Sequence, residues 1–202
     1  MGKKLLNLKL FAVVAAMMCA LGASAAEAYA CYTSSNTTLT FYYDNYRSSR
    51  TGVTYDLNTG SNIPGWYTDG TSSNVTKVVF NSSFAIARPT TTNSWFYYMK
   101  NLQSITGLSY LNTSEVTNMG YMFGDCKKLT SLDLRSFNTS KVTDMPFMFS
   151  GCSSLTYLDL SSFNTSKVTI MEYMFEGCSG LTRLDLSSFN TSKVTSIVLH
   201  VL

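Results

Sequence analysis

Apolar side chains recur along the C-terminal half of the chain at a fixed interval of 26 residues. The stretch LTSLDLRSFNTSKVTDMPFMFSGCSS begins at Leu129, LTYLDLSSFNTSKVTIMEYMFEGCSG follows it from Leu155 without insertion, and LTRLDLSSFNTSKVT begins at Leu181. A degenerate copy precedes them and places the start of the repeat near Ile105. A period of this length predicts units that stack, because one unit alone cannot bury enough apolar surface to fold.

The apolar spacing changes within one unit. Leu132 and Leu134 have the two-residue spacing of a strand with one buried face. The later apolar residues have the spacing of one helix face; they are Val142, Met145, Met148, Phe149 and Cys152. Thr143 is a suitable N-cap, and Gly151 stands where such a helix would end. Each unit is therefore predicted to be a short strand, a turn and a short helix.

Residues 26–100 lack the repeat and are rich in aromatic side chains. Strands are predicted at residues 29–33, 38–44, 52–57 and 75–80, separated by Ser-, Asn-, Gly- and Pro-containing turns. A stack of repeats exposes its first apolar layer unless another segment covers it. This region is therefore predicted to be a β-rich cap on the N-terminal end of the repeats.

The first 25 residues have the pattern of a secretory signal peptide. Lys3, Lys4 and Lys9 precede or flank an apolar segment at 10–21, and Ala23-Ser24-Ala25 forms a small-residue cleavage site. The apolar segment is shorter than the roughly 20 residues that a transmembrane helix needs, so no membrane span is expected in the mature chain. Removing three lysines from 15 basic residues leaves as many basic as acidic residues, 12 of each, which gives no basic footprint for nucleic acid. The chain is predicted to be secreted or displayed on a cell surface.

The repeat resembles a known family. The L-x-x-L-x-L segment is similar to a leucine-rich repeat, and the string LDLSSFNTSKVT-x-M-x-x-MF-x-x-C resembles the BspA-type leucine-rich repeat surface proteins of bacteria. The stretches FYYDNYRSSRTGVTYDL, GWYTDGT and KNLQSITGL resemble the N-terminal region of that family. The resemblance implies an α/β fold, a leucine-rich-repeat-like solenoid of about 3.5 units over residues 101–202. It also implies adhesion to host extracellular-matrix proteins or to another bacterial surface.

One position departs from the general leucine-rich pattern. Phe137 occupies the place of the expected Asn or Cys, and Asn138 follows one residue later. Whether Asn138, Asn164 and Asn190 form a buried amide ladder is therefore left open by the sequence.

The last unit is incomplete. Continuing the period predicts Met at 197 and 200, where the chain has Ile197 and His200. Two interpretations follow: a truncated, non-functional fragment, or an apolar tail SIVLHVL that packs on the last layer or on a partner.

Cysteine recurs once per unit, at Cys126, Cys152 and Cys178. Disulfides are common in exported proteins, but a column of three cannot pair completely. We therefore expect small buried hydrophobic side chains in a core ladder. The members of this predicted core ladder are Cys126, Cys152, Cys178, Met145, Met171, Phe149 and Phe175.

The sequence offers little for catalysis, and no cofactor or metal is predicted. His200 is the lone histidine, so a Cys-His or Ser-His-Asp group has no base, and the isolated cysteines lack the spacing of a zinc site. Asp133, Asp159 and Asp185 form an outward column, for which a calcium site and a solvated ladder are alternatives. A hydrolase with paired carboxylates is a further alternative to a non-enzymatic protein.

Binding is predicted on the concave strand face, where the copies differ. The residues assigned to this partner site are Ser131, Asp133, Arg135, Tyr157, Asp159, Arg183 and Asp185. Tyr and Arg are enriched at binding hot spots, so a protein partner is expected. Lys141, Lys167 and Lys193 form a second column, which would favour an acidic partner.

The alternative binding hypothesis is a glycan-binding module in the cap. It uses aromatic side chains as stacking platforms: Tyr42, Tyr43, Trp66, Tyr67, Trp95 and Phe96.

Overall fold

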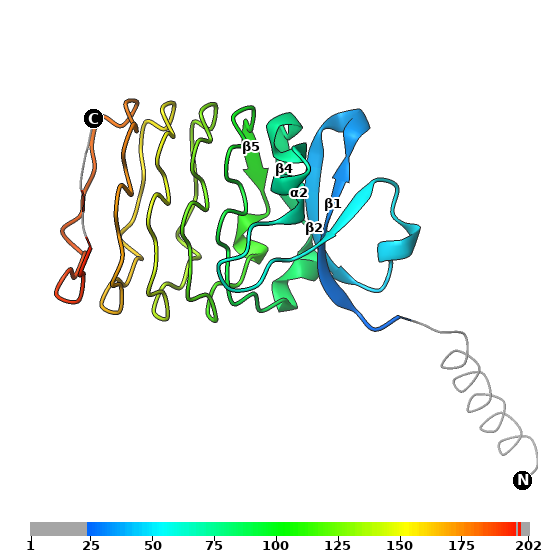
Figure 1. Ribbon diagram of the computed structural model, residues 1–202, viewed down its shortest axis with the longest axis horizontal. Helices are drawn as coiled ribbons and strands as arrows, with labels where there is room; N and C mark the ends of the chain where they lie inside the picture. The colour runs from blue at the N-terminus through cyan, green and yellow to red at the C-terminus, as the bar shows by residue number, and fades with distance from the viewer. Residues whose placement is uncertain (1–23, 197, 199–202) are drawn as a thin grey trace, which may run out of the picture.

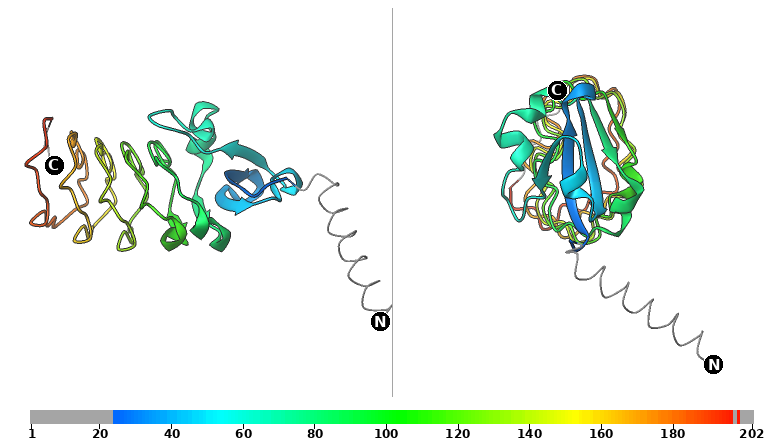
Figure 2. Two further views of the ribbon diagram at one scale, coloured as in Figure 1. Left: turned by 90° about the horizontal axis from the view of Figure 1, so that it is seen from below. Right: turned by 90° about the vertical axis from the view of Figure 1, so that its right-hand side faces the viewer.

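The structure is a computed structural model that describes residues 24–196 and residue 198. A β-sheet lies at one end of an elongated molecule, and a series of coils extends from it (Figure 1). Seen along the long axis, the coils lie behind one another (Figure 2). The predicted signal peptide falls almost entirely on residues 1–23, and Ile197 and His200 of the predicted tail also lie outside the described residues.

The sheet has five strands in the order β3-β1-β2-β4-β5. The strands are β1 (Glu27–Thr33), β2 (Thr38–Asp44), β3 (Val53–Asp56), β4 (Lys77–Phe80) and β5 (Ser104–Thr106). The first three pair antiparallel, whereas β2 with β4 and β4 with β5 pair parallel. The described residues contain one α-helix, α2 (Gly65–Thr68), together with the 3-10 helices η1 (Ser34–Asn36), η2 (Arg47–Ser49), η3 (Thr71–Asn74), η4 (Ser82–Ile86) and η5 (Leu108–Tyr110).

Four of the five strands form where the sequence predicts them. Residues 29–32 of β1 are all buried, whereas buried positions alternate with more exposed ones in β4 and in part of β2. In β2, for example, Leu39 and Phe41 are fully buried while Thr40 and Tyr42 are only partly buried. The fifth strand, β5, was not predicted. It lies beyond residue 100, so the sheet extends past the boundary predicted between cap and repeats.

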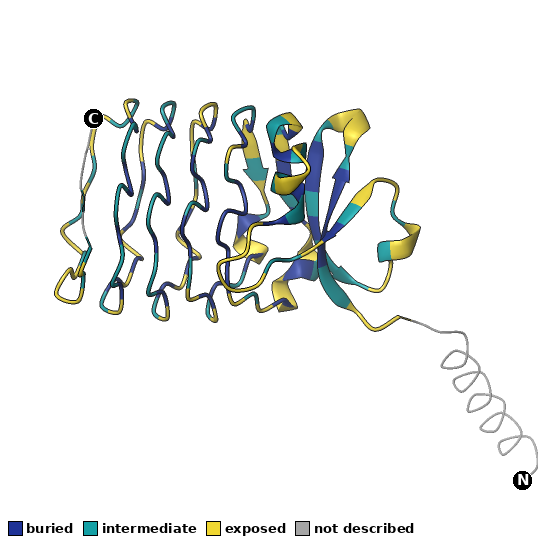
Figure 3. Ribbon diagram, in the orientation of Figure 1, coloured by how far each residue is buried: buried dark blue, intermediate teal, exposed yellow. Residues whose placement is uncertain are grey.

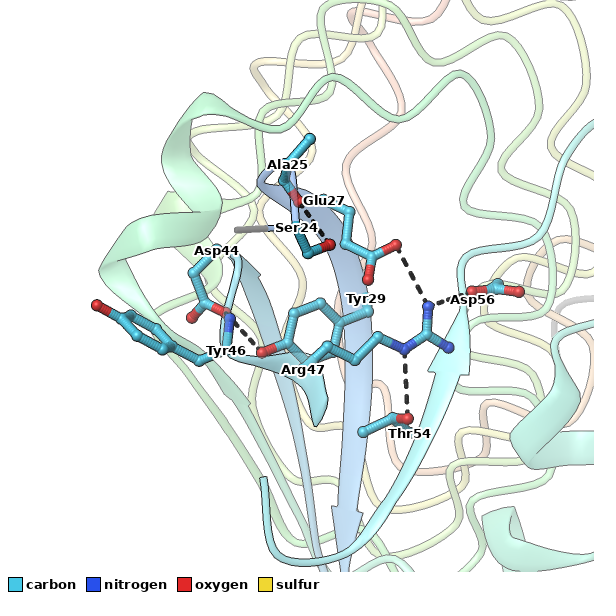
Figure 4. Close-up of polar contacts among 9 residues, drawn as sticks. All are labelled: Ser24, Ala25, Glu27, Tyr29, Asp44, Tyr46, Arg47, Thr54 and Asp56. Atoms are coloured by element: carbon cyan, nitrogen blue, oxygen red, sulfur yellow. Dashed lines mark hydrogen bonds and ion pairs between the residues drawn. The ribbon is translucent and has the colours of Figure 1, made fainter. Parts of the chain in front are cut away.

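A loop that includes η2 folds over the outer face of the sheet (Figure 4). Arg47 forms ion pairs with Glu27, at 3.4 Å, and with Asp56, and its Nε donates to the hydroxyl of Thr54. The loop returns through Gly52, whose φ of +133° and close approach to the Tyr32 carbonyl leave no room for a side chain. The strands β1 and β3 are thus linked on their outer face by one guanidinium group.

The inner face of the sheet continues into the coil interior as one core (Figure 3). Phe41 stacks on Trp95 with ring centroids 5.0 Å apart, and the Trp66 indole donates to the Trp95 carbonyl at 2.7 Å. Phe96 then contacts Phe123 of the next coil at 5.3 Å. The aromatic side chains of residues 26–100 therefore cover the first layer of the stack.

The predicted α/β, leucine-rich-repeat-like solenoid of strand–turn–short-helix units is wrong. Neither a helix nor a strand is present between residues 111 and 196; the units consist of turns and isolated β-bridges. The proposed helix after Thr143 fails because Phe147 and Gly151 adopt positive φ values, 55° and 72°. Their amides donate to Glu172 and Glu176 carbonyls of the next coil at 2.8 and 2.7 Å instead of to residues one turn back.

Neighbouring coils are hydrogen-bonded through the segment that was predicted to be helical. Parallel bridges join equivalent positions in register: Thr91, Asn118, Asp144, Ile170 and Ser196. Alternate amides after each bridge donate to the next coil, as Met119 does to Asp144 and Phe123 does to Met148. The predicted strand through Leu132 and Leu134 does not form, and these residues lie in irregular backbone.

A threonine ladder takes the place of the asparagine ladder. Thr139 is buried; its hydroxyl donates to the Asn164 carbonyl at 3.1 Å and accepts the Asn164 amide at 2.7 Å. Thr113 and Thr165 make the same pair of bonds with Asn138 and Asn190. The asparagine side chains are exposed and accept a backbone amide two residues on. The asparagines therefore form no buried amide ladder, and the buried ladder consists of threonine hydroxyls.

Candidate binding groove

Three adjoining hollows cross the face of the coils that carries the variable residues. Their volumes are about 590, 350 and 210 Å³. We call this surface the repeat groove and define it by Ser131, Asp133, Arg135, Tyr157, Asp159, Arg183 and Asp185. The structure therefore brings together all seven residues of the predicted partner site, although no strand carries them.

The three aspartates of the groove cap turns. Each accepts the backbone amide two residues further on, at 3.2 Å for Asp133 and 3.0 Å for Asp159 and Asp185. Hydrogen bonds from the side chain and the amide two residues on stabilise the charged form, so the carboxyl pKa is lowered in all three. The main cause is the side chain of Arg135 for Asp133, whose pKa falls to about 2, of Ser161 for Asp159 and of Ser187 for Asp185. The groove therefore carries a row of ionised carboxylates at neutral pH.

The basic side chains alternate with these carboxylates. Arg135 binds Asp133 through its Nε and Nη2 atoms at 2.9 and 2.7 Å. Arg183 lines the smallest hollow with Asp185 and Tyr157. The groove thus presents both signs of charge rather than a single-sign field.

Tyr157 is the large apolar side chain of the groove, with 62% of its surface exposed. The equivalent positions in the preceding and following units are Ser131 and Arg183. Because the same backbone position accepts Ser, Tyr and Arg, stacking of the coils does not require the exposed tyrosine ring.

The lysine column lies on exposed turns. Lys141 is paired with Glu115 of the preceding coil at 2.7 Å. Lys167 and Lys193 are exposed at the equivalent positions. With both partners of the Lys141 pair about half exposed, this interaction contributes little to stability.

The core ladder is buried throughout, and the cysteines are free thiols. Each thiol of the column donates to a carbonyl of the preceding coil: Cys126 to Phe96, Cys152 to Phe123 and Cys178 to Phe149, at 3.0–3.2 Å. Burial raises the thiol pKa, to about 11 for Cys178. These cysteines are therefore unreactive packing residues.

Within residues 24–196 and 198, no group of three or more His, Cys, Asp or Glu side chains is placed to hold a metal ion. The same part of the chain has no helix of the length and hydropathy needed to cross a membrane.

Half of the six aromatic rings proposed to stack on a glycan are buried in the core. Trp66, Trp95 and Phe96 are fully buried. Tyr42 is partly buried, with the Arg50 guanidinium 3.7 Å from its ring centroid. Three of the six predicted rings are therefore unavailable for stacking on a sugar.

Sequence reasoning missed an aromatic column on the surface of the coils. Tyr97, Tyr121, Phe147 and Tyr173 follow one another with centroid separations of 5.2, 4.7 and 4.9 Å. The last three stand 26 residues apart in MGYMF, MPFMF and MEYMF, a signal that was visible in the sequence. All four are half-buried.

The fold and groove define a repeat protein in which turn-built coils are closed at one end by a mixed sheet. The chain belongs to the DUF285 family, described as "Mycoplasma protein of unknown function", whose sequence profile matches residues 71–157 and 131–199. No curated protein and no solved structure was found to match the chain. The similarity to BspA-type proteins stays a prediction.

Proposed function

We propose that this protein is a secreted or cell-surface interaction protein without catalytic activity, and that it binds a protein partner through the repeat groove. The observation that carries the proposal is Tyr157, which stays 62% exposed at a position where the fold also accepts Ser and Arg. A large exposed ring beside an arginine is the composition of a binding hot spot.

The groove also favours binding over hydrolysis. A general acid needs a carboxyl pKa raised toward the working pH. The pKa values of Asp133, Asp159 and Asp185 are lowered instead, because each carboxylate accepts hydrogen bonds from a residue two positions on. Such carboxylates suit fixed ionic contacts with a partner.

The expected partner is a host extracellular-matrix protein or a protein of another bacterial surface. This part of the proposal rests on the signal-peptide pattern of residues 1–25 and on the resemblance of the repeat string to bacterial surface proteins.

The test measures binding of the purified protein to immobilised extracellular-matrix proteins and to whole bacterial cells. The double variant Tyr157→Ala with Arg183→Ala should weaken the binding by at least about tenfold, since hot-spot side chains contribute more than about 1.4 kcal/mol each. Tyr46→Ala is the matched control, because Tyr46 is equally exposed, at 61%, but lies in the sheet region.

If the double variant and the Tyr46→Ala control bind with equal affinity, the binding site lies outside the groove. A loss of affinity accompanied by a lower melting temperature would instead assign a structural role to Tyr157 and Arg183.

A further inference from the structure

Another hollow, of about 590 Å³, lies beside the aromatic column and shares no lining residue with the three hollows of the repeat groove. Its lining includes Tyr97, Tyr121 and Pro146, together with Ile63 of the loop before α2. The volume falls in the range of ligand-binding sites. This hollow is therefore large enough to hold several side chains of a partner.

The rings of the column cover one another. Tyr121 and Phe147 are parallel within 6°, and Phe147 and Tyr173 within 21°. Their faces are consequently used inside the column, and their edges line the surface. Both faces of Phe147 are covered in this way, which leaves no platform there for a sugar ring, whereas an aliphatic side-chain stem packs against ring edges.

The column is kept at a conformational cost. Tyr121, Phe147 and Tyr173 adopt positive φ values of 56°, 55° and 52°, which bulky residues rarely take. Gly, Asn or Asp would adopt this conformation more easily. Three successive units nevertheless carry an aromatic ring at this position.

Carboxylates flank the column. Asp144 lines the hollow, and Glu172 is the equivalent of Pro146 in the next coil, so it extends the same wall. Glu176 follows on the same coil. Asp144 accepts the Thr143 hydroxyl at 2.6 Å and Glu172 accepts the Ser196 hydroxyl. Among the described residues, none of these three carboxylates forms an ion pair with Lys or Arg.

The lining of the hollow contains no basic residue. A ligand that neutralises Asp144 and Glu172 must therefore bring the positive charge itself. From this charge complementarity and the ring edges beside it, we propose that the aromatic column and its flanking carboxylates bind an extended segment of a partner protein that carries Lys or Arg side chains. The alkyl stems pack on the rings, and the cationic ends reach the carboxylates.

The probe is a synthetic peptide of alternating glycine and arginine, titrated calorimetrically into the purified protein at low and at physiological salt. The double variant Asp144→Asn with Glu172→Gln should weaken peptide binding by about tenfold or more. The matched control, Asp56→Asn with Glu115→Gln, removes the same charge from surface carboxylates that lie outside both the hollow and the repeat groove, and it should change affinity less than about twofold. An equal loss in both double variants would show unspecific charge attraction and overturn the proposal.

Ile170→Lys tests the same site without removing a hydrogen bond. Ile170 lines the hollow, and the equivalent bridge positions hold Asn118, Asp144 and Ser196, so the fold accepts polar side chains there. The added cation should abolish peptide binding while the melting curve stays unchanged. Peptide binding that survives Ile170→Lys would overturn the proposal. A third outcome is that the unchanged protein binds no peptide but self-associates in light scattering, and that Ile170→Lys abolishes this association. The occupant of the hollow would then be a second copy of the chain, and the proposed cationic segment would be wrong.

Discussion

The sheet and the coils solve the same packing problem in different ways. In the sheet each buried contact occurs once: the Trp66 indole has its own carbonyl partner, and Phe41 packs against five aromatic neighbours in different orientations. In the coils one contact is made again at each junction, as the Phe123, Phe149 and Phe175 rings show by stacking within 7° of parallel. The packing of the sheet thus depends on contacts that individual residues make once, whereas the packing of the coils depends on the 26-residue register that aligns equivalent residues.

The difference has an energetic consequence. A residue inside a coil contacts the coil before it and the coil after it, so one substitution weakens two junctions. A residue in the sheet weakens one local cluster. Substitutions in the two regions should therefore have different effects on the cooperativity of unfolding as well as on stability.

The largest effect is expected for Phe149→Ala. Phe149 is fully buried between Phe123 and Phe175, with ring centroids 5.6 and 5.8 Å away. Removing the ring should destabilise the protein by about 3–5 kcal/mol through cavity formation. Urea unfolding followed by circular dichroism should also show a lower slope, because the coils beyond the cavity uncouple from the rest. A loss below about 1 kcal/mol would contradict the role of the ring stack.

A smaller effect is expected for Thr139→Val. Valine keeps the shape but leaves the amide and the carbonyl of Asn164 without their hydroxyl partner. A free-energy loss of about 1–3 kcal/mol should appear in chemical denaturation. Thr139→Ser retains the hydroxyl and should recover most of the stability; an equal loss in both variants would assign the effect to the methyl group.

The smallest effect on stability at neutral pH is expected for two tyrosines of the sheet region, Tyr29 and Tyr55. Their titration at alkaline pH distinguishes the sheet from the coils. Burial raises the pKa of Tyr29 and of Tyr55 to about 12, and the carboxylates of Asp44 and Asp69, which accept hydrogen bonds from these hydroxyls, add to the shift. The folded protein therefore holds protons that the unfolded chain releases near pH 10, so this stabilisation is complete below pH 10 and is lost as pH rises toward 12.

The measurement follows tyrosinate absorbance and circular dichroism together from neutral to alkaline pH. Tyr29→Phe with Tyr55→Phe should retain its structure to higher pH than the unchanged protein. Identical alkaline transitions in the two proteins would mean that other groups control the loss of structure.

The sequence allowed the period, the buried positions and four strands to be predicted. Cys152, Met145 and Phe149 recur at a fixed interval and are buried, because inward positions of stacked units must be apolar whatever their backbone. The strands β1 to β4 were predictable because short runs rich in strand-forming residues lie between turn signals.

The conformation inside the unit was not predictable from the same pattern. Apolar residues three apart fit a helix, yet successive tight turns place Met145, Met148 and Cys152 inward with the same spacing. The choice depends on where the amides find acceptors, and here the acceptors are in the next coil. A one-dimensional pattern does not contain that information.

The candidate site was predicted better than the backbone that carries it. Tyr157 and Arg183 were expected to be neighbours because they are one period apart, and they line the same hollow. The aromatic column was not predictable from the helical pattern, because Tyr121, Phe147 and Tyr173 stand between the methionines assigned to the buried helix face.

The threonine ladder makes the two sides of a coil chemically complementary. At three successive junctions one coil offers a backbone carbonyl and amide to the threonine hydroxyl of the coil before it, so these junctions have the same chemistry. A duplication or deletion of a whole 26-residue unit therefore creates no new kind of junction, whereas any other change in length displaces Thr139 from its partner. Recombination between near-identical repeats can thus alter the reach of the protein in fixed steps while the sheet that closes its end stays the same.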